Sequence, residues 1–272
     1  MSPRHPAAAP GGTSAPRMPS SDVLRWAAWP MRAIGAVADL ALPSVCGGCG
    51  AVGTPWCPEC RAVLARATAR PRIVAGRAGS ACAPDGPVVA AGAYEGVVRR
   101  CLVDFKDHGR RDLIGVLAPP LRAALLTAIA MRPELGPVVP IVPAPSSPRS
   151  RRERGDVPTH LLVRAALADL DVLTGRSCVW TPVLRHARRV GDQARLSRTE
   201  RARNTDHAFV LARPLARPLA RPQVSVGRDV LVVDDVVTTG ATVRECVRVL
   251  REAGARPVAV VALAATPAAR RP

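Results

Sequence analysis

The chain has 272 residues, of which 48% are hydrophobic, so it can form one full domain with a core and a small additional module. This composition argues against a chain without a hydrophobic core. The formal net charge of +18 comes almost wholly from arginine, since Lys106 is the only lysine. Such a charge favours polyanionic partners, either a pyrophosphate-bearing substrate or a nucleic acid, and does not choose between them.

The N-terminal segment 1–21 is rich in Pro, Ala, Ser and Gly, and we expect it to be disordered. The apolar stretch Val23–Leu42 follows, but it contains two arginines, an aspartate and Pro30. These residues argue against a secretory signal and against a membrane span. An amphipathic helix with a break near Pro30 fits better, and we expect a cytoplasmic protein.

Two C-x-x-C pairs come next, and seven residues separate them. Their cysteines are Cys46, Cys49, Cys57 and Cys60. Each pair can turn a tight knuckle that offers two thiolates, with neighbouring glycines relieving backbone strain. In a cytosolic protein this pattern favours structural Zn²⁺ over disulfides, with an iron–sulfur cluster or a redox dithiol as alternatives. Because cysteine fills all four ligand positions, none stays open for catalysis. We expect a separate small zinc module within 22–65.

From about Pro87 the pattern alternates between strands and helices. Strands are predicted at Val88–Ala93, Val138–Val142, Cys178–Leu184, Ala208–Leu211 and Val258–Leu263, and helices at Gly96–Phe105, from Asp112 to about Met131, and at Val157–Leu170. This alternation predicts an α/β domain over 66–266, with a mostly parallel sheet flanked by helices on both faces. Ligands of such sheets bind beyond the carboxyl ends of the strands. A proline-rich surface loop is expected at 211–222.

Two arginine-dense segments interrupt this pattern. In the first, a loop after the strand at 138–142 could hold a pyrophosphate through backbone amides and through Arg152 or Arg154. The second, 185–204, is charged and only weakly apolar, as in a mobile lid or a nucleic-acid arm. Its candidate residues are Arg188, Arg189, Gln193, Arg195 and Arg201. The alternative for both segments is a solvated charged face in an arginine-rich chain.

The most specific pattern is VLVVDDVVTTGATV at Val230–Val243. The apolar residues 230–233 predict a buried parallel strand that stops at Asp234 and Asp235. A Thr/Gly loop and a helix from about Ala241 follow, so unpaired backbone N–H groups at the helix start point at one volume that suits a phosphate. The two acids can hold vicinal sugar hydroxyls and a hydrated Mg²⁺. The alternative is an ordinary capped helix with acids that face solvent.

This motif resembles the phosphoribosyl-pyrophosphate loop of the type I phosphoribosyltransferases. By that resemblance, Asp234 and Asp235 bind the ribose hydroxyls. The 5′-phosphate would be wrapped by Thr238, Thr239, Gly240, Ala241 and Thr242.

Several features, in this order, are similar to the ComF family, phosphoribosyltransferase-like proteins linked to DNA uptake in natural competence. They are the paired C-x-x-C motifs, Tyr94 and Lys106, Val142-Pro143-Ala144-Pro145, Arg152-Glu153-Arg154-Gly155, a segment with Gln193, Leu196, Arg201, Asn204 and Phe209, and the acid–threonine motif. The resemblance covers about Leu40–Leu263. It implies binding of phosphoribosyl pyrophosphate with Mg²⁺, and we expect Ala144, Arg152, Arg154 and Lys106 on the pyrophosphate. One departure is Asp156-Val157-Pro158, where the family has an aromatic residue, Asn and Gln, on the acceptor side.

Two functions therefore compete. The first is a pentosyl-transferring enzyme that displaces pyrophosphate from C1 with a base or an amine, for which no residue stands out as general base. The second is an accessory factor that keeps the donor pocket and binds single-stranded DNA during DNA uptake. Such binding usually adds aromatic stacking, and the chain has only four Trp, one Tyr and two Phe. A third function, nucleotide-sensing regulation, has no recognisable DNA-reading motif in its support.

Overall fold

The computed structural model describes residues 44–74, 86–145, 157–187, 208–212 and 227–267, and Val45–Pro272 form one compact unit. The helices are α2 (Pro58–Ala67), α3 (Gly96–Asp107), the short 3₁₀ helix η1 (Arg111–Leu113), α4 (Ile114–Ala130), α6 (Pro158–Ala166), α7 (Leu170–Thr174) and α9 (Ala241–Glu252). The strands are β1 (Arg72–Val74), β2 (Val88–Ala93), β3 (Val138–Pro143), β4 (Ser177–Trp180), β5 (Leu184–His186), β6 (Phe209–Leu211), β7 (Asp229–Val237) and β8 (Arg256–Ala265). The expected N-terminal tail and the helix at Val23–Leu42 lie outside the described residues.

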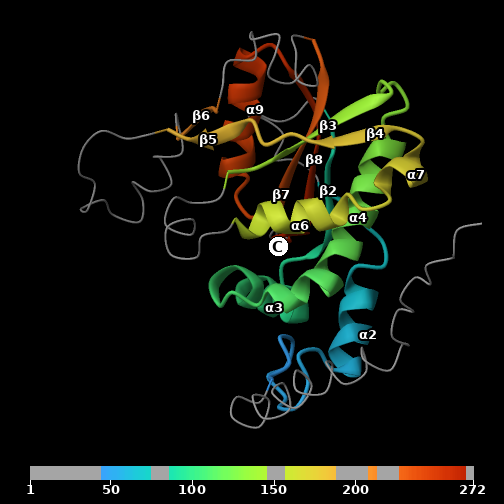
Figure 1. Cartoon of the computed structure of the whole chain (residues 1–272), viewed down its shortest axis with the longest axis vertical. Helices are drawn as coiled ribbons and strands as arrows, with labels where there is room; N and C mark the ends of the chain where they lie inside the picture. Colours follow the sequence, from blue (N-terminus) through green and yellow to red (C-terminus); the bar gives the residue numbers. More distant parts are fainter. Residues whose placement is uncertain (1–43, 75–85, 146–156, 188–207, 213–226, 268–272) are drawn as a thin grey trace, which may run out of the picture. The chain divides into compact units, whose positions relative to one another are not determined.

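Six strands form the central sheet, in the order β1-β2-β8-β7-β3-β4 (Figure 1). All neighbouring strands are parallel except the edge pair of β1 and β2. The central strands β7 and β8 contain long apolar runs, 230–233 in β7 and 257–265 in β8, because a parallel strand in the middle of a sheet is covered on both faces. This confirms the mostly parallel α/β sheet that the sequence predicts.

Helices cover both faces of the sheet, and alternate residues of β7 separate the two cores. Leu231 and Val233 pack into the larger core with α4 and α6, whereas Val230 and Val232 pack into a smaller core with α9. The helix α9 contributes Cys246 and Leu250 to this smaller core and ends at Glu252, and Gly254, just beyond its C-cap Ala253, has a left-handed φ of 82°. A separate antiparallel pair, β5 and β6, lies beside α9.

One helical stretch among the described residues, Arg111–Ala130, is long and apolar enough to cross a membrane. Most of it is α4, which packs against β2, β8 and α6. Its residues Leu117, Leu121 and Leu125 are fully buried in the larger core. In this fold the stretch is therefore the core helix that covers one face of the sheet.

Two elements differ from the sequence-based expectation. The strand expected at Cys178–Leu184 is two strands in different sheets, β4 and β5, and Pro182 between them has no N–H to continue a ladder. The helix expected at Val157–Leu170 ends early at Ala166, and a short helix α7 begins after Asp169, whose φ of 61° is left-handed. In the expected loop at 211–222, Leu211 still belongs to β6, and 213–222 lie outside the described residues.

Candidate functional site

The acid pair lies inside the carboxyl-terminal half of β7. The prediction that the strand stops at these acids is wrong, because β7 continues through them to Val237 in register with β8. Asp234 is 8% exposed and Asp235 is 2% exposed, so neither is a solvent-facing acid. Because successive side chains of a strand point to opposite faces, the two carboxylates lie on different sides of the strand.

Asp235 is held from two helices on the side of the larger core. The Lys106 Nζ at the end of α3 donates to its Oδ1 at 2.9 Å. The Thr159 hydroxyl in the first turn of α6 donates to its Oδ2 at 2.7 Å. Burial lowers the pKa of Lys106, but the charge of Asp235, the hydrogen bond to it and the charges of nearby acids together outweigh this effect, so the pKa is raised. The expected pyrophosphate-binding lysine thus reaches the acid pair, as an ion pair with a buried carboxylate.

Thr159 escaped the sequence-based reasoning. Thr159 belongs to no recognised motif, and it follows directly after the unusual Asp156-Val157-Pro158 stretch. Pro158 at the first helical position places the threonine in the first turn of α6. The single sequence signal was therefore a polar residue in the first turn of a helix that begins near the carboxyl edge of the sheet.

Asp234 lies on the side of the smaller core. Burial, with a further contribution from the charge of Asp235, raises its pKa to about 8. Its Oδ1 accepts a hydrogen bond of 2.8 Å from the backbone N–H of Asp235. The charge of Asp234 also adds to burial in raising the pKa of the Cys246 thiol on α9. The free site thus holds one paired carboxylate and one that keeps a proton near neutral pH.

The threonine–glycine turn links β7 to α9. Thr238 and Thr239 are exposed, and Gly240 is the residue before the helix, with a left-handed φ of 75°. Arg244 donates to the carbonyl of Thr239 at 2.8 Å, and the Thr239 hydroxyl accepts from the N–H of Ala241 at 3.4 Å. The first turn of α9, with Ala241 and Thr242, contains no acidic residue. The positive end of a twelve-residue helix therefore points at this turn, as an anion site requires.

The neighbouring strand β3 ends at the same edge of the sheet. The N–H of Ala144, which is 2% exposed, donates to the carbonyl of Val233 at 2.8 Å. The structure therefore brings together Asp234, Asp235, Lys106, Ala144 and the turn at 238–242. The other expected site residues lie outside the described residues: Arg152 and Arg154 of the pyrophosphate loop, and Arg188, Arg189, Gln193, Arg195 and Arg201 of the lid or nucleic-acid segment.

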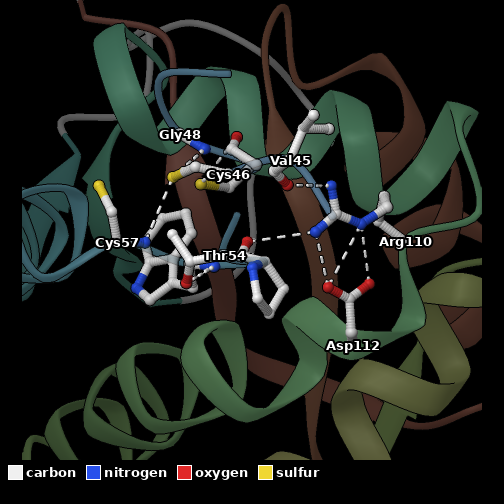
Figure 2. A network of polar contacts seen from close by, with 11 residues as sticks. Val45, Cys46, Gly48, Thr54, Cys57, Arg110 and Asp112 are labelled. Carbon is white, nitrogen blue, oxygen red and sulfur yellow. Dashed lines mark hydrogen bonds and ion pairs between the residues drawn. The ribbon is translucent and has the colours of Figure 1, made fainter. Parts of the chain in front are cut away.

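The four cysteines of the C-x-x-C pairs form a second site, in the module at residues 45–60. All four Sγ atoms lie within 4.8 Å of one another, and only Cys49 is exposed. The Cys46 Sγ accepts from the N–H groups of Gly48 and Cys57, both at 3.4 Å (Figure 2). The Cys57 Sγ accepts from the N–H of Cys60 at 3.4 Å. Such N–H donors stabilise thiolates, and four sulfurs at this separation fit one tetrahedral Zn²⁺.

The glycines of the knuckle are required by space and by backbone conformation. A Cβ on Gly48 would lie 2.5 Å from the Cys60 Sγ, which is a severe overlap. Gly50 and Gly53 have left-handed φ values of 80° and 97°. Burial raises the pKa of Cys46, but N–H donors led by that of Cys57 outweigh it and lower the pKa to about 6.

The four-cysteine module packs into the same core as the sheet. Cys46, Trp56 and Cys60 belong to the larger hydrophobic cluster together with residues of α3 and α4. The boundary expected near 65/66 therefore does not separate two hydrophobic cores. Arg110 adds a polar link, since its guanidinium donates to the carbonyls of Val45 at 2.8 Å and Pro55 at 3.2 Å (Figure 2).

Comparison with known proteins points to the C-terminal third of the chain. Residues 187–272 match the family model of the phosphoribosyl transferase domain, and the match includes β7, α9 and β8. No curated protein matches the chain.

Two solved structures are similar to part of the chain. The allosteric regulatory enzyme of purine biosynthesis is 23% identical over 54% of this chain and 26% of its own, with a TM-score of 0.29. Adenine phosphoribosyltransferase is 17% identical over 53% of this chain and 81% of its own, with a TM-score of 0.28. The match thus spans about a quarter of the first protein. TM-scores this low do not establish a common fold. The similarity to the phosphoribosyl transferase domain therefore rests on the segment 187–272, which contains the acid–threonine motif.

Proposed function

We propose that this protein binds phosphoribosyl pyrophosphate with Mg²⁺ at the carboxyl edge of β7 and β3 and transfers the phosphoribosyl group to a base or an amine. The observation that carries the proposal is the buried pair Asp234 and Asp235, followed by the Thr238–Gly240 turn that begins α9. The match of 187–272 to the phosphoribosyl transferase domain supports it. The ordered motifs listed above favour a ComF-like member of that group.

The donor's charged parts have matching groups at this edge. The 5′-phosphate would lie against the turn at 238–242, where backbone N–H groups and threonine hydroxyls meet the positive end of α9. The ribose hydroxyls would donate to Asp234 and Asp235. Carboxylate oxygens are ligands that Mg²⁺ accepts, usually together with substrate phosphates and water, so these acids would also face the hydrated ion. Lys106, with Arg152 and Arg154 of the preceding loop, would bind the pyrophosphate.

The reaction would be a substitution at C1 of the ribose. The bond from C1 to the pyrophosphate oxygen breaks, and pyrophosphate leaves with the electron pair. The acceptor nitrogen forms the new bond to C1 and loses a proton. Because C1 gains positive character before the new bond forms, the protein contributes mainly by holding the two ends of the donor and by stabilising charge. We assign no general base among the described residues.

An accessory role in DNA uptake remains the alternative, and it rests on the net charge of +18 and on the arginines at 185–204. A triple change of Arg188, Arg189 and Arg195 to Ala tests it. If these arginines bind single-stranded DNA, the log–log slope of affinity against salt should flatten by about 2, since each phosphate contributes roughly 0.7. Donor binding should then stay nearly unchanged.

The decisive experiment for the enzyme is calorimetric titration with phosphoribosyl pyrophosphate in the presence and absence of Mg²⁺. Ribose 5-phosphate and pyrophosphate are titrated separately, so that each half of the site is probed. A pyrophosphate-release assay across bases and amines then looks for turnover. Binding that requires Mg²⁺ and weakens in Asp235→Asn supports the proposal. No binding of the donor, or equal binding by the Asp235→Asn variant, contradicts it.

A further inference from the structure

Three features outside the donor site attach the four-cysteine module to the end of α3. Arg110 donates to the backbone carbonyls of Val45 and Pro55, which lie just before the first and second cysteine pairs. The Cys101 thiol on α3 donates to the carbonyl of Gly47 at 3.6 Å. A Cβ on Gly47 would lie 2.9 Å from the Leu113 side chain, so the knuckle backbone packs directly on the last residue of η1.

Arg110 is the central contact, because one guanidinium bridges both halves of the module. Its orientation is fixed by Asp112, whose carboxylate accepts from the Arg110 Nε at 2.9 Å and Nη2 at 2.7 Å (Figure 2). One guanidinium can donate to both carbonyls only while the two cysteine pairs keep their relative position. A metal ion that binds all four sulfurs fixes that relationship.

The same turn positions the lysine of the acid–threonine site. Lys106 lies in the last turn of α3, and the N–H of Arg110 donates to the carbonyl of Asp104 at 3.1 Å. The bridging arginine therefore lies four positions after the lysine that pairs with Asp235 at 2.9 Å. A shift of the turn would move the Lys106 ammonium relative to a carboxylate that is buried in the sheet and cannot follow.

We propose that Arg110 is a positioning residue through which the metal-bound four-cysteine module holds Lys106 in place for the phosphoribosyl-pyrophosphate site. The expected effect on donor affinity rests on the proposed function. The link from the four-cysteine module to Lys106 does not depend on it. Metal loss or a broken Arg110 contact then loosens the ion pair of Lys106 and Asp235 without removing any group that touches the ligand.

The composition of the chain provides a direct readout, since Lys106 is its only lysine. A short treatment with an amine-acetylating reagent, followed by peptide mass spectrometry, reports how accessible this one side chain is. The α-amino group of the chain serves as an internal reference. An amine released from its ion pair with Asp235 is more exposed to the reagent.

The experiment compares the full-length zinc-loaded protein with Arg110→Gln, Asp112→Asn and the control Arg99→Gln. Arg99 is an exposed arginine on the same helix α3. We expect Lys106 to be acetylated several-fold faster in Arg110→Gln at full zinc content and unchanged circular dichroism. A smaller increase is expected in Asp112→Asn, and none in Arg99→Gln. Stripping zinc from the parent should raise the rate to at least the level of Arg110→Gln.

The donor is measured on the same samples by calorimetry, where Arg110→Gln should weaken binding about fivefold or more. If the acetylation rate of Lys106 is unchanged in zinc-loaded Arg110→Gln, the link is overturned, whatever the measured donor affinity. If Arg110→Gln does not fold, unchanged acetylation in the milder Asp112→Asn variant overturns it equally. Faster acetylation of Lys106 in Arg110→Gln, together with a parent protein that binds no donor, would keep the link and reject the proposed function, so the two failures are distinguishable.

Discussion

The four-cysteine site and the acid–threonine site bury polar atoms in different ways. In the four-cysteine site, sulfurs accept from backbone N–H groups of the same module, and the four ligand atoms are already within 4.8 Å of one another. In the acid–threonine site, one carboxylate depends on side chains from two distant helices and the other keeps a proton. The first arrangement suits a permanent ion. The second suits a ligand that comes and goes, because binding can replace partners and release a proton.

The largest expected effect lies in the four-cysteine site. Cys60→Ser should lower the zinc content from about one per chain to near zero and lower the melting temperature by roughly 10 °C, since a structural zinc site contributes strongly to folding. Cys60 is 5% exposed and packs within the larger core, so the loss should reach the sheet. The exposed Cys49→Ser serves as the matched variant. It should also lose zinc, with a smaller fall in melting temperature. Elemental analysis and thermal unfolding decide, and a zinc-free parent protein would contradict the assignment.

The second-largest effect is expected in the acid–threonine site, at the turn between β7 and α9. Gly240→Val should weaken donor binding by roughly 100-fold, because a β-branched residue resists the left-handed φ of 75° and crowds the phosphate cradle. Gly240→Ala separates the two causes. A Cβ there would lie 3.4 Å from the Arg244 Nη1, which leaves room for a methyl group and retains only the backbone cost. Calorimetry with phosphoribosyl pyrophosphate and Mg²⁺ measures both variants, and affinities equal to the parent's would remove this turn from the site.

A smaller effect tests the dependence on distant helices. Thr159→Val removes the hydroxyl that donates to the Asp235 Oδ2 and keeps the side-chain shape. A hydrogen bond to a charged group is worth about 1.5 kcal/mol, so donor affinity should fall about tenfold. The control is Thr127→Val in α4, whose hydroxyl donates to the carbonyl of Ala123 within the helix. If Thr159→Val and Thr127→Val bind the donor with equal affinity, the hydrogen bond from Thr159 to Asp235 does not contribute to donor binding.

The last effect concerns the protonated carboxylate and is read from the stability of the protein, not from donor affinity. The pKa of Asp234 is raised from 3.8 to about 8 by burial and by the charge of Asp235. The folded protein therefore keeps a proton that the unfolded chain releases near pH 4. This group's contribution to folding stability is full below about pH 4, falls as the pH rises and is lost above about pH 8. Melting temperatures of the parent should decline more steeply from about pH 5 to 8 than those of Asp234→Asn, and parallel curves would refute this.

Local patterns in the sequence predicted most of the fold. The strand Val88–Ala93 and the helix from Ala241 agree with the structure because hydrophobic periodicity and the Thr-Thr-Gly turn act over a few neighbouring residues. The cysteine cluster was predicted for the same reason. In the candidate site, the turn and the acids form one contiguous motif, so they too could be read from the sequence.

Contacts between distant residues could not be predicted in this way. The hydroxyl of Thr159 and its acceptor on Asp235 are 76 residues apart, and Arg110 is 65 residues from Val45. Neither residue belongs to a motif, because the requirement for it arises only when helices pack against the sheet. The continuation of β7 through its acids likewise depends on pairing with β8, which no local pattern records.

The place of β8 in the sheet has a consequence for how the chain folds during synthesis. This strand, Arg256–Ala265, is the last described element to be made, yet it lies between β2 and β7 and pairs with both. Until it leaves the ribosome, both neighbours keep an unpaired edge, and such edges attract other strands. The cysteine module is made about two hundred residues earlier, so all four thiols of a nascent chain are available to a metal ion before the central sheet can close.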